Sequence, residues 1–156
     1  MKKQWFYLLI WLCILFILSS DFFSYSATRK LIKDALVFFD PDISIRTVLR
    51  IHAFLRKVLH VINYAILSWF FLCAWTSTFQ PISKWTGKIG LLSFLCCVLF
   101  SLSDEWRQSL SPLRTPTIFD VVLDASGALL MQLYFMIRVH IRQKKHHVRQ
   151  TTETLS

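Results

Sequence analysis

Four long stretches of apolar residues constrain the fold of this chain more than any other feature of its sequence. They run from Trp5 to Leu18, from about Val58 to Phe79, from about Ile89 to Ser103 and from about Ile118 to Val139. These runs lack the alternating pattern of a membrane β-strand. The chain has 156 residues, 54% of them hydrophobic and only 17% charged, against roughly 25% charged in ordinary soluble domains. We therefore expect an all-α integral membrane protein, with lipid covering its apolar surface.

The predicted fold is a four-helix membrane bundle formed by a single domain over residues 1–140. Its transmembrane helices are expected over residues 5–23, 58–79, 89–110 and 118–139. Pro81 ends the second of these helices, and Pro112 and Pro116 bracket the turn into the fourth. A basic tail is expected over residues 141–156.

The first apolar run is short for a transmembrane helix and has two interpretations. A basic start followed by a short apolar core also fits a secretory signal peptide. No A-x-A cleavage site follows, which favours a retained helix that Phe22 and Phe23 lengthen. Its Lys2 and Lys3 side chains can then reach back to the lipid headgroups. The sequence leaves retention and cleavage both open.

The loop between the first and second apolar runs is expected to contain structure of its own. Its segments 27–39 and 43–55 carry apolar residues at mixed three- and four-residue spacing. This spacing predicts short amphipathic helices. We expect these helices to lie on the outer leaflet of the membrane.

The net charge of +9 reflects membrane anchoring rather than nucleic-acid binding. The basic residues cluster at the ends of the apolar runs and do not form a stripe with exposed aromatic residues between them. We therefore expect membrane lipids or lipid-linked envelope precursors as partners, and no nucleic acid. The sequence does not indicate an oligomeric state.

The orientation of the chain follows from where its charges fall. An even number of spans places both termini on one side of the membrane. Lys and Arg are equally divided between the two sides, so the positive-inside rule does not decide in its strict form. The basic tail adjoins the last helix, whereas much of the charge on the other side lies in the long loop, remote from the helix ends. We therefore expect a multi-pass protein of the cell membrane with both termini in the cytoplasm.

Polar side chains gather near the extracytoplasmic end of the predicted bundle, and the helix centres are expected to be entirely apolar. On each helix the polar residues recur one turn apart, as with Asp120 and Asp124, so they share a face. Gly127 and Ala128 follow on the last helix and permit a close approach of helices there. Ionisable groups at membrane depth are costly and normally face the bundle interior. The members of this cluster are Arg56, Lys57, His60, Tyr64, Asp104, Glu105, Gln108, Arg114, Asp120 and Asp124.

Each of these residues, taken alone, also has a purely structural interpretation. Asp120 could cap the positive end of the fourth helix. Arg114 and Asp104 could form a salt bridge that orders the turn between helices. Arg56 and Lys57 could bind lipid phosphates at the membrane surface. The gathering of so many polar residues at one face nevertheless favours a functional site.

Two runs of the chain carry motifs typical of a known family. They are RKVLHVINYAILSW at residues 56–69 and SLSDEWRQSLSPLRTPTIFDVVLDASGALL at residues 101–130. These runs resemble the VanZ-like membrane proteins, which show R-K-x-x-H-x-x-x-Y, then D-E-x-x-Q, a small loop with Arg, and D-x-x-x-D/N-x-x-G. The matching positions are Arg56, Lys57, His60, Tyr64, Asp104, Glu105, Gln108, Arg114, Asp120, Asp124 and Gly127. Two departures are Asn63, where the family often has Glu, and the loop SPLRTP, which lacks the family's Pro-Gly-Arg turn.

The resemblance implies a link to low-level resistance to glycopeptide antibiotics, to teicoplanin more than to vancomycin, but it supplies no mechanism. The first functional hypothesis is an enzyme acting on a lipid-linked or phosphorylated envelope substrate at the outer leaflet. Asp120 could orient His60, or could bind a divalent cation together with Asp104. The expected catalytic residues are His60, Asp104, Glu105 and Asp120. The expected substrate-binding residues are Arg56, Lys57, Tyr64, Gln108, Arg114 and Asp124.

The second hypothesis is a non-catalytic membrane protein that binds an envelope lipid or the lipid anchor of the antibiotic. The polar cluster then holds the helices and a headgroup together through hydrogen bonds. A transport role is less favoured, because entirely apolar helix centres would offer no polar path across the bilayer.

Overall fold

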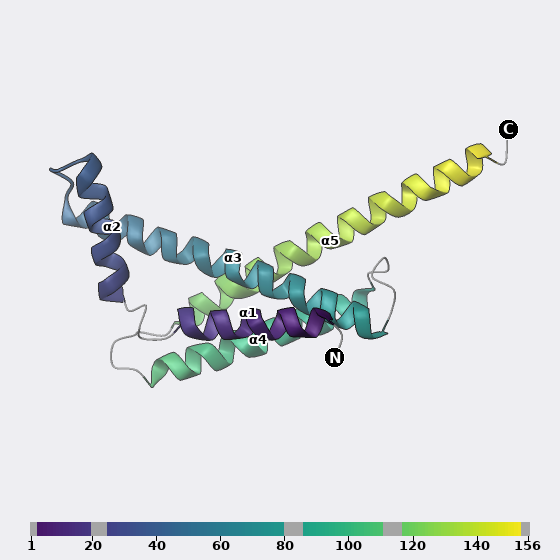
Figure 1. Ribbon diagram of the computed structural model, residues 1–156, viewed down its shortest axis with the longest axis horizontal. Coiled ribbons are helices and arrows are strands. Elements are labelled where there is room, and N and C mark those ends of the chain that lie inside the picture. Colours follow the sequence, from purple (N-terminus) through teal and green to yellow (C-terminus); the bar gives the residue numbers. More distant parts are fainter. Residues whose placement is uncertain (1–2, 20–24, 80–85, 111–116, 154–156) are drawn as a thin grey trace.

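The computed structural model describes residues 3–19, 25–79, 86–110 and 117–153 of the chain, and in these residues the fold is entirely helical (Figure 1). This confirms the all-α prediction. The helices are α1 (Lys3–Leu18), α2 (Tyr25–Phe39), α3 (Ile45–Phe79), α4 (Gly87–Ser109) and α5 (Ile118–Glu153).

Three of the described helices are long and apolar enough to cross a membrane. They are α3, α4 and the part of α5 between Ile118 and Lys144. α1 is also apolar, but its 16 residues fall short of the roughly 17–25 that a span requires. The structure therefore supports three membrane spans by length and composition, and the predicted four-helix bundle is not confirmed. The expected extension of the first helix through Phe22 and Phe23 lies outside the described residues.

α3 begins at Ile45, so the predicted start at residue 58 is wrong. The segment 43–55 was expected to form a separate amphipathic helix, but it is the first part of α3. The physical reason is that no Gly or Pro interrupts the chain between Ile43 and Phe79, so the amphipathic and apolar parts continue as one helix. Ser44 starts this helix, because its Oγ accepts a hydrogen bond from the backbone N–H of Thr47 at 3.2 Å.

α2 confirms the other predicted amphipathic helix, which was expected over residues 27–39. It packs on the first part of α3, where Thr28 Oγ1 and His52 Nε2 are 3.0 Å apart and Val48 is buried. In Figure 1, α2 lies beyond the end of α1 and runs across the direction of α1 and α4. Its expected position on the outer leaflet stays a prediction.

The bounds of α4 agree with the predicted helix over 89–110 to within two residues, whereas α5 is much longer than predicted. Thr86 caps α4 by accepting a hydrogen bond from the backbone N–H of Ile89. α5 was expected to end at residue 139 but continues to Glu153. Residues 140–153 contain no Gly or Pro and are rich in Lys, Arg and Gln, which favour helix. No helix end marks the expected boundary between the membrane domain and its tail.

α3 is the central helix, because it packs against each of the other four. α1 runs antiparallel to α3: Trp5 Nε1 donates to Thr78 Oγ1 at 3.0 Å near one end of the bundle, and Ser19 lies beside the C-terminal part of α4 at the other. We call this second end, where Ser19, Arg56, Asp104 and Asp120 lie, the polar end. The core between the two ends consists of Leu8, Leu15, Tyr64, Leu67, Ala74, Cys97 and Ala128.

α3 and α5 approach each other closely at Gly127. A Cβ added to this glycine would overlap the backbone carbonyl of Val61. One residue further along α5, the backbone carbonyl of Ala128 accepts a hydrogen bond from Ser68 Oγ at 3.2 Å. The close helix approach predicted for Gly127 and Ala128 is thus confirmed, and it brings the polar faces of α3 and α5 together.

Candidate functional site

Polar side chains pair across the α3–α5 interface at a constant separation of 64 residues. The pairs advance together along both helices, so α3 and α5 run in the same direction and hold one register over several turns. From the polar end inward, the pairs are Arg56 with Asp120 at 3.4 Å, His60 with Asp124 at 2.9 Å and Ser68 with Gln132 at 2.9 Å. The four-residue spacing on each helix explains why the partners face each other.

The deepest of these pairs corrects one expectation. Ser68 and Gln132 are both buried and lie well inside the apolar runs of α3 and α5. The expectation that the helix centres are entirely apolar is therefore wrong. These two side chains hydrogen-bond to each other, which is how polar groups are usually accommodated between membrane helices.

His60, Asp124 and Ser101 form a hydrogen-bonded chain that joins three helices. The Asp124 side chain is almost fully buried, with 2% of the residue exposed. Its Oδ1 is 2.9 Å from His60 Nδ1, and its Oδ2 accepts a hydrogen bond from Ser101 Oγ at 2.6 Å. When Asp124 is ionised, His60 Nδ1 carries the proton of this hydrogen bond. The carboxylate thereby fixes both the tautomer and the ring orientation of His60.

The second ring nitrogen of His60, Nε2, differs from Nδ1 in its surroundings. The described part of the chain provides no hydrogen bond to Nε2, which is the acceptor nitrogen in the tautomer that Asp124 selects. The His60 side chain is 19% exposed, so it is neither sealed in the core nor free in solvent. A partly covered histidine oriented by a carboxylate can accept and return a proton as a general base and acid.

Arg56 and Asp120 lie one helical turn nearer the polar end than the His60–Asp124 pair. Arg56 Nη2 and Asp120 Oδ2 are 3.4 Å apart, and the Arg56 side chain is partly exposed. A single contact at this distance occupies little of the guanidinium, which carries five N–H donors. Asp120, for which orienting His60 was one of two possible roles, is hydrogen-bonded to Arg56, and it is Asp124 that bonds His60.

Asp104 belongs to a separate hydrogen-bonded network between α1 and α4. Its Oδ2 accepts from Ser19 Oγ at 2.5 Å and from Gln108 Nε2 at 2.7 Å, and its Oδ1 accepts from Arg107 Nη2 at 2.9 Å. Arg107 also donates to the backbone carbonyl of Ser19 at 2.5 Å and lies over the Phe16 ring. Both oxygens of Asp104 are thus bonded to protein donors.

Sequence reasoning missed Ser19, Ser101 and Arg107. A signal existed for Arg107, because it stands three residues after Asp104 and therefore on the same helix face. None existed for Ser19, whose bond to Asp104 joins residues 85 positions apart. Ser101 lies one turn before Glu105 on α4, but only the packing of α4 on α5 brings it to Asp124.

The comparison with protein families shows which family the chain belongs to. The VanZ/LLP1 family model matches residues 4–139 of the chain, which include the three polar pairs and the Asp104 network. The chain belongs to the VanZ/LLP1 family. No curated protein and no solved structure matches it. Membership confirms the resemblance inferred from the motifs at residues 56–69 and 101–130.

The other predicted site residues of this VanZ/LLP1 chain have different surroundings. Glu105 is buried, and its Oε2 accepts a hydrogen bond from the backbone N–H of Thr117 at 3.1 Å, directly before α5 begins. Tyr64 is buried one turn below His60, where its ring packs near Phe100. Lys57 is exposed. Arg114 lies outside the described residues.

The divalent cation considered for Asp104 and Asp120 in this VanZ/LLP1 chain stays a prediction. Asp104 bonds Ser19, Arg107 and Gln108, while Asp120 bonds Arg56. Within the described residues, no three His, Cys, Asp or Glu side chains come together in a group that could hold a metal ion. The two carboxylates therefore have separate protein partners, one in each network.

Proposed function

We propose that this VanZ-like membrane protein acts on a lipid-linked or phosphorylated cell-envelope molecule, with His60 as the general acid and base. The observation that carries the proposal is the chain His60–Asp124–Ser101, in which a buried carboxylate orients a partly exposed histidine. The Ser101 hydroxyl donates a hydrogen bond to the Asp124 carboxylate, so Ser101 is not the nucleophile. A water molecule or a substrate hydroxyl takes that role, and His60 Nε2 accepts its proton.

The basic residues beside His60 favour a substrate with a phosphate group. Arg56 keeps free N–H donors next to its contact with Asp120, and Lys57 is exposed on the following position. Guanidinium groups bind phosphate oxygens through paired hydrogen bonds. In the proposed reaction the attacking oxygen forms a bond to phosphorus, the leaving oxygen departs, and His60 returns the proton to that oxygen.

We further propose that the polar end faces the outside of the cell, with both termini in the cytoplasm. In this orientation His60 and Arg56 lie at the outer leaflet, on the side of the membrane where we propose the envelope substrate to be. Together with the family resemblance, it leads us to propose a contribution to low-level teicoplanin resistance.

A second candidate function has an observation of its own. In the network of Ser19, Asp104, Arg107 and Gln108, both oxygens of Asp104 bond to protein donors. Such a network suits a helix-to-helix lock better than a catalytic carboxylate. In this alternative the protein binds an envelope lipid or the lipid anchor of teicoplanin without catalysis.

The test of the proposal is antibiotic susceptibility in a sensitive Gram-positive host. The host carries the wild type, His60→Gln or Asp124→Asn at matched membrane levels, and teicoplanin and vancomycin are compared. We expect the wild type to protect more against teicoplanin, and both variants to lose that protection, because general acid–base catalysis contributes about 10²–10⁴ in rate. His140→Gln is the matched control, since His140 is an exposed histidine in the second half of α5, away from the polar end.

Three outcomes would count against parts of this proposal. Protection that survives in His60→Gln would remove His60 from the chemistry. If protection is also lost in Asp104→Asn, the binding alternative gains support, because Asp104 belongs to the helix lock. Absence of protection by the wild type would remove the resistance link itself.

A further inference from the structure

Glu105 differs from the other three acids described at the polar end in its partners. Each of those three is paired with a basic side chain, in the pairs Asp104–Arg107 at 2.9 Å, Asp120–Arg56 at 3.4 Å and Asp124–His60 at 2.9 Å. Glu105 has no basic partner in the described part of the chain. Its Oε2 accepts a hydrogen bond from the backbone N–H of Thr117 at 3.1 Å, and no described donor bonds its Oε1.

This lack of a basic partner is important because the Glu105 side chain is nearly buried. The residue is only 8% exposed, so water meets little of its charge. A carboxylate removed from water is costly unless a cation or sufficient hydrogen-bond donors compensate it. One backbone N–H compensates one oxygen and leaves the other. The Glu105 carboxylate is therefore suited to bind a positively charged group from outside the chain.

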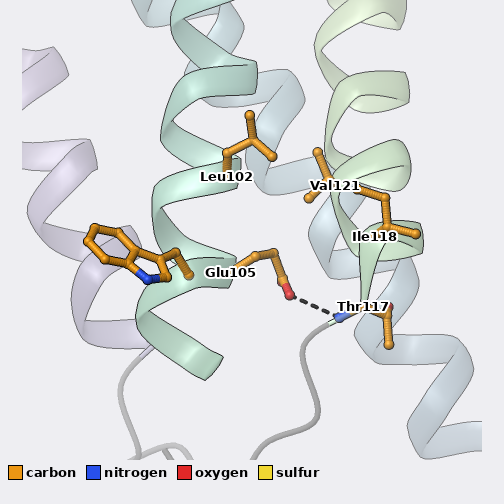
Figure 2. A pocket seen from close by; sticks show the side chains of 6 residues that line it. Leu102, Glu105, Thr117, Ile118 and Val121 are labelled. Carbon is orange, nitrogen blue, oxygen red and sulfur yellow. Dashed lines mark hydrogen bonds between the residues drawn. The ribbon is translucent and has the colours of Figure 1, made fainter. Parts of the chain in front are cut away.

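A cavity beside Glu105 gives such a group room to bind. It lies between α4 and α5, has a volume of about 250 Å³ and is lined by Leu102, Glu105, Trp106, Thr117, Ile118 and Val121. Figure 2 shows Leu102 on α4 and Val121 on α5 on either side of the space between the two helices, with Glu105 reaching across to Thr117. Trp106 and Ile118 are also exposed, so the cavity opens on the surface of the bundle. We call this cavity the α4–α5 groove.

The lining of the α4–α5 groove favours an organic cation. Among the described lining residues, Glu105 is the one that carries a charge, so the groove is complementary to a cation and repels an anion. A metal ion is not favoured, because the lining offers one carboxylate and no further acid, His or Cys. A primary ammonium group has three N–H donors, and one of them can bond Oε1 of Glu105. The exposed indole of Trp106 adds an aromatic face that attracts cations.

The α4–α5 groove is also graded from polar to apolar along the bundle. Leu102 and Val121 lie about one helical turn deeper in the bundle than Glu105 and Thr117, because α4 ends and α5 begins at the polar end. An amphiphile in the adjacent lipid leaflet has the same gradation, with its chain deeper than its head. A small amine dissolved in water has no apolar part to match Leu102 and Val121.

From these observations we infer that the α4–α5 groove binds the primary ammonium head of a single-chain amphiphile, with Glu105 as its counter-ion. The inference goes beyond the proposed function and does not depend on any chemistry at His60. The volume of the groove is below the roughly 300–1,000 Å³ of pockets that enclose a drug-sized ligand. The groove therefore holds the head and the first part of the chain, and the remaining chain lies in the lipid.

Fluorine NMR of the full chain tests the inference. The protein carries 5-fluorotryptophan at its six tryptophans in nanodiscs of phosphatidylcholine, whose choline head has no N–H donor, and Trp106→Phe identifies the Trp106 signal. Dodecylamine is then titrated. We expect the Trp106 signal to shift and saturate, and the signal of Trp5, near the opposite end of the bundle, to stay in place. A Trp106 shift that does not saturate, or an equal shift of both signals, would overturn the inference.

Three further ligands separate the contribution of the head from that of the chain. Dodecyl phosphate and dodecanol have the same chain as dodecylamine, and butylamine has the same head with a short chain. At equal concentration in the nanodisc, we expect the affinity of each to be at least about tenfold lower than that of dodecylamine, since hydrogen bonds between charged groups are the strong ones. Equal binding of dodecyl phosphate or dodecanol would contradict the ammonium site. Equal binding of butylamine would contradict a lipid ligand.

Three variants make the test specific to the groove. Glu105→Gln keeps an acceptor for the Thr117 N–H but removes the charge, and we expect it to lower the dodecylamine affinity about tenfold. Val121→Phe fills the groove and is expected to lower the affinity as well. Val122→Phe is its matched control, because Val122 is 60% exposed, whereas Val121 is 8% exposed and lines the groove.

These variants keep the inference falsifiable even where one of them folds poorly. The signals of the other tryptophans report whether each variant retains its fold. Wild-type affinity in a folded Glu105→Gln protein would overturn the inference. If Glu105→Gln does not fold, equal affinities in Val121→Phe and Val122→Phe would overturn it, and a loss in Val121→Phe alone would support it.

Discussion

The α3–α5 interface and the attachment of α1 are built in different ways. α3 and α5 meet at their backbones, because Gly127 leaves no room for a Cβ against Val61. α1 is held by side chains along its length: Leu8 and Leu15 are buried in the core, Trp5 donates to Thr78 near one end, and Ser19 donates to Asp104 at the other. Close backbone packing therefore fixes the site itself, whereas side-chain packing and hydrogen bonds secure α1, a helix that is short for a membrane span.

Substitution of Gly127 is expected to have the largest effect on stability, because it acts on the α3–α5 interface. We expect Gly127→Ala to lower the free energy of unfolding by about 1–3 kcal/mol, because the new Cβ forces α3 and α5 apart. Thermal unfolding of the purified protein in detergent measures the effect. Gly87→Ala is the matched control, since a Cβ there meets nothing within 4 Å. Equal melting temperatures for the two variants would show that the helices are not in close contact at Gly127.

Substitution of Ser19 tests the attachment of α1 at the polar end. The Ser19 hydroxyl bonds Asp104, Arg107 and Gln108, so we expect Ser19→Ala to lower the free energy of unfolding by about 1–2 kcal/mol. The same thermal unfolding measurement applies. In the control Ser103→Ala, the lost hydroxyl has one partner among the described residues, the Leu99 carbonyl of its own helix. A Ser19→Ala effect no larger than that of Ser103→Ala would mean that the network does not hold α1.

Substitution of Trp5 is expected to have the smallest effect on the free energy of unfolding. It tests the attachment of α1 at the end opposite the polar end. Trp5→Phe removes an exposed hydrogen bond to Thr78 but leaves an aromatic ring for the edge contact with Trp75. We expect a loss of about 0.5 kcal/mol, seen as a small decrease in melting temperature. Trp106→Phe is the control on an exposed tryptophan. A loss of unfolding free energy larger than that of Ser19→Ala would mean that α1 is held more strongly at Trp5 than at Ser19.

Much of the helical fold could be predicted from the sequence, because apolar runs and their breakers are local signals. The helix predicted over 89–110 is observed as Gly87–Ser109, and α2 is observed where segment 27–39 predicted it. The predicted helix bounds are wrong where no Gly or Pro interrupts the sequence. α3 starts at Ile45 and α5 continues to Glu153, since amphipathic and apolar segments join into one helix when neither Gly nor Pro separates them.

The candidate site could be predicted as a gathering of polar groups, but not as a set of pairs. Helical periodicity places Asp120 and Asp124 on one face, and it places Arg56 and His60 on another. Periodicity does not say which acid faces which base. That choice depends on how far α5 is shifted along α3, and the close approach at Gly127 sets this shift.

The close approach at Gly127 also prevents α5 from sliding along α3. Polar groups that repeat every four residues would otherwise permit a slip of one helical turn, which would place His60 opposite Asp120 or Arg56 opposite Asp124. Such a slip brings Leu123 or Met131 to the place of Gly127, and the Cβ of either would collide with the Val61 carbonyl. The absence of a side chain at residue 127 therefore fixes the register of α5 on α3 in both directions, and this register decides which acid orients the histidine.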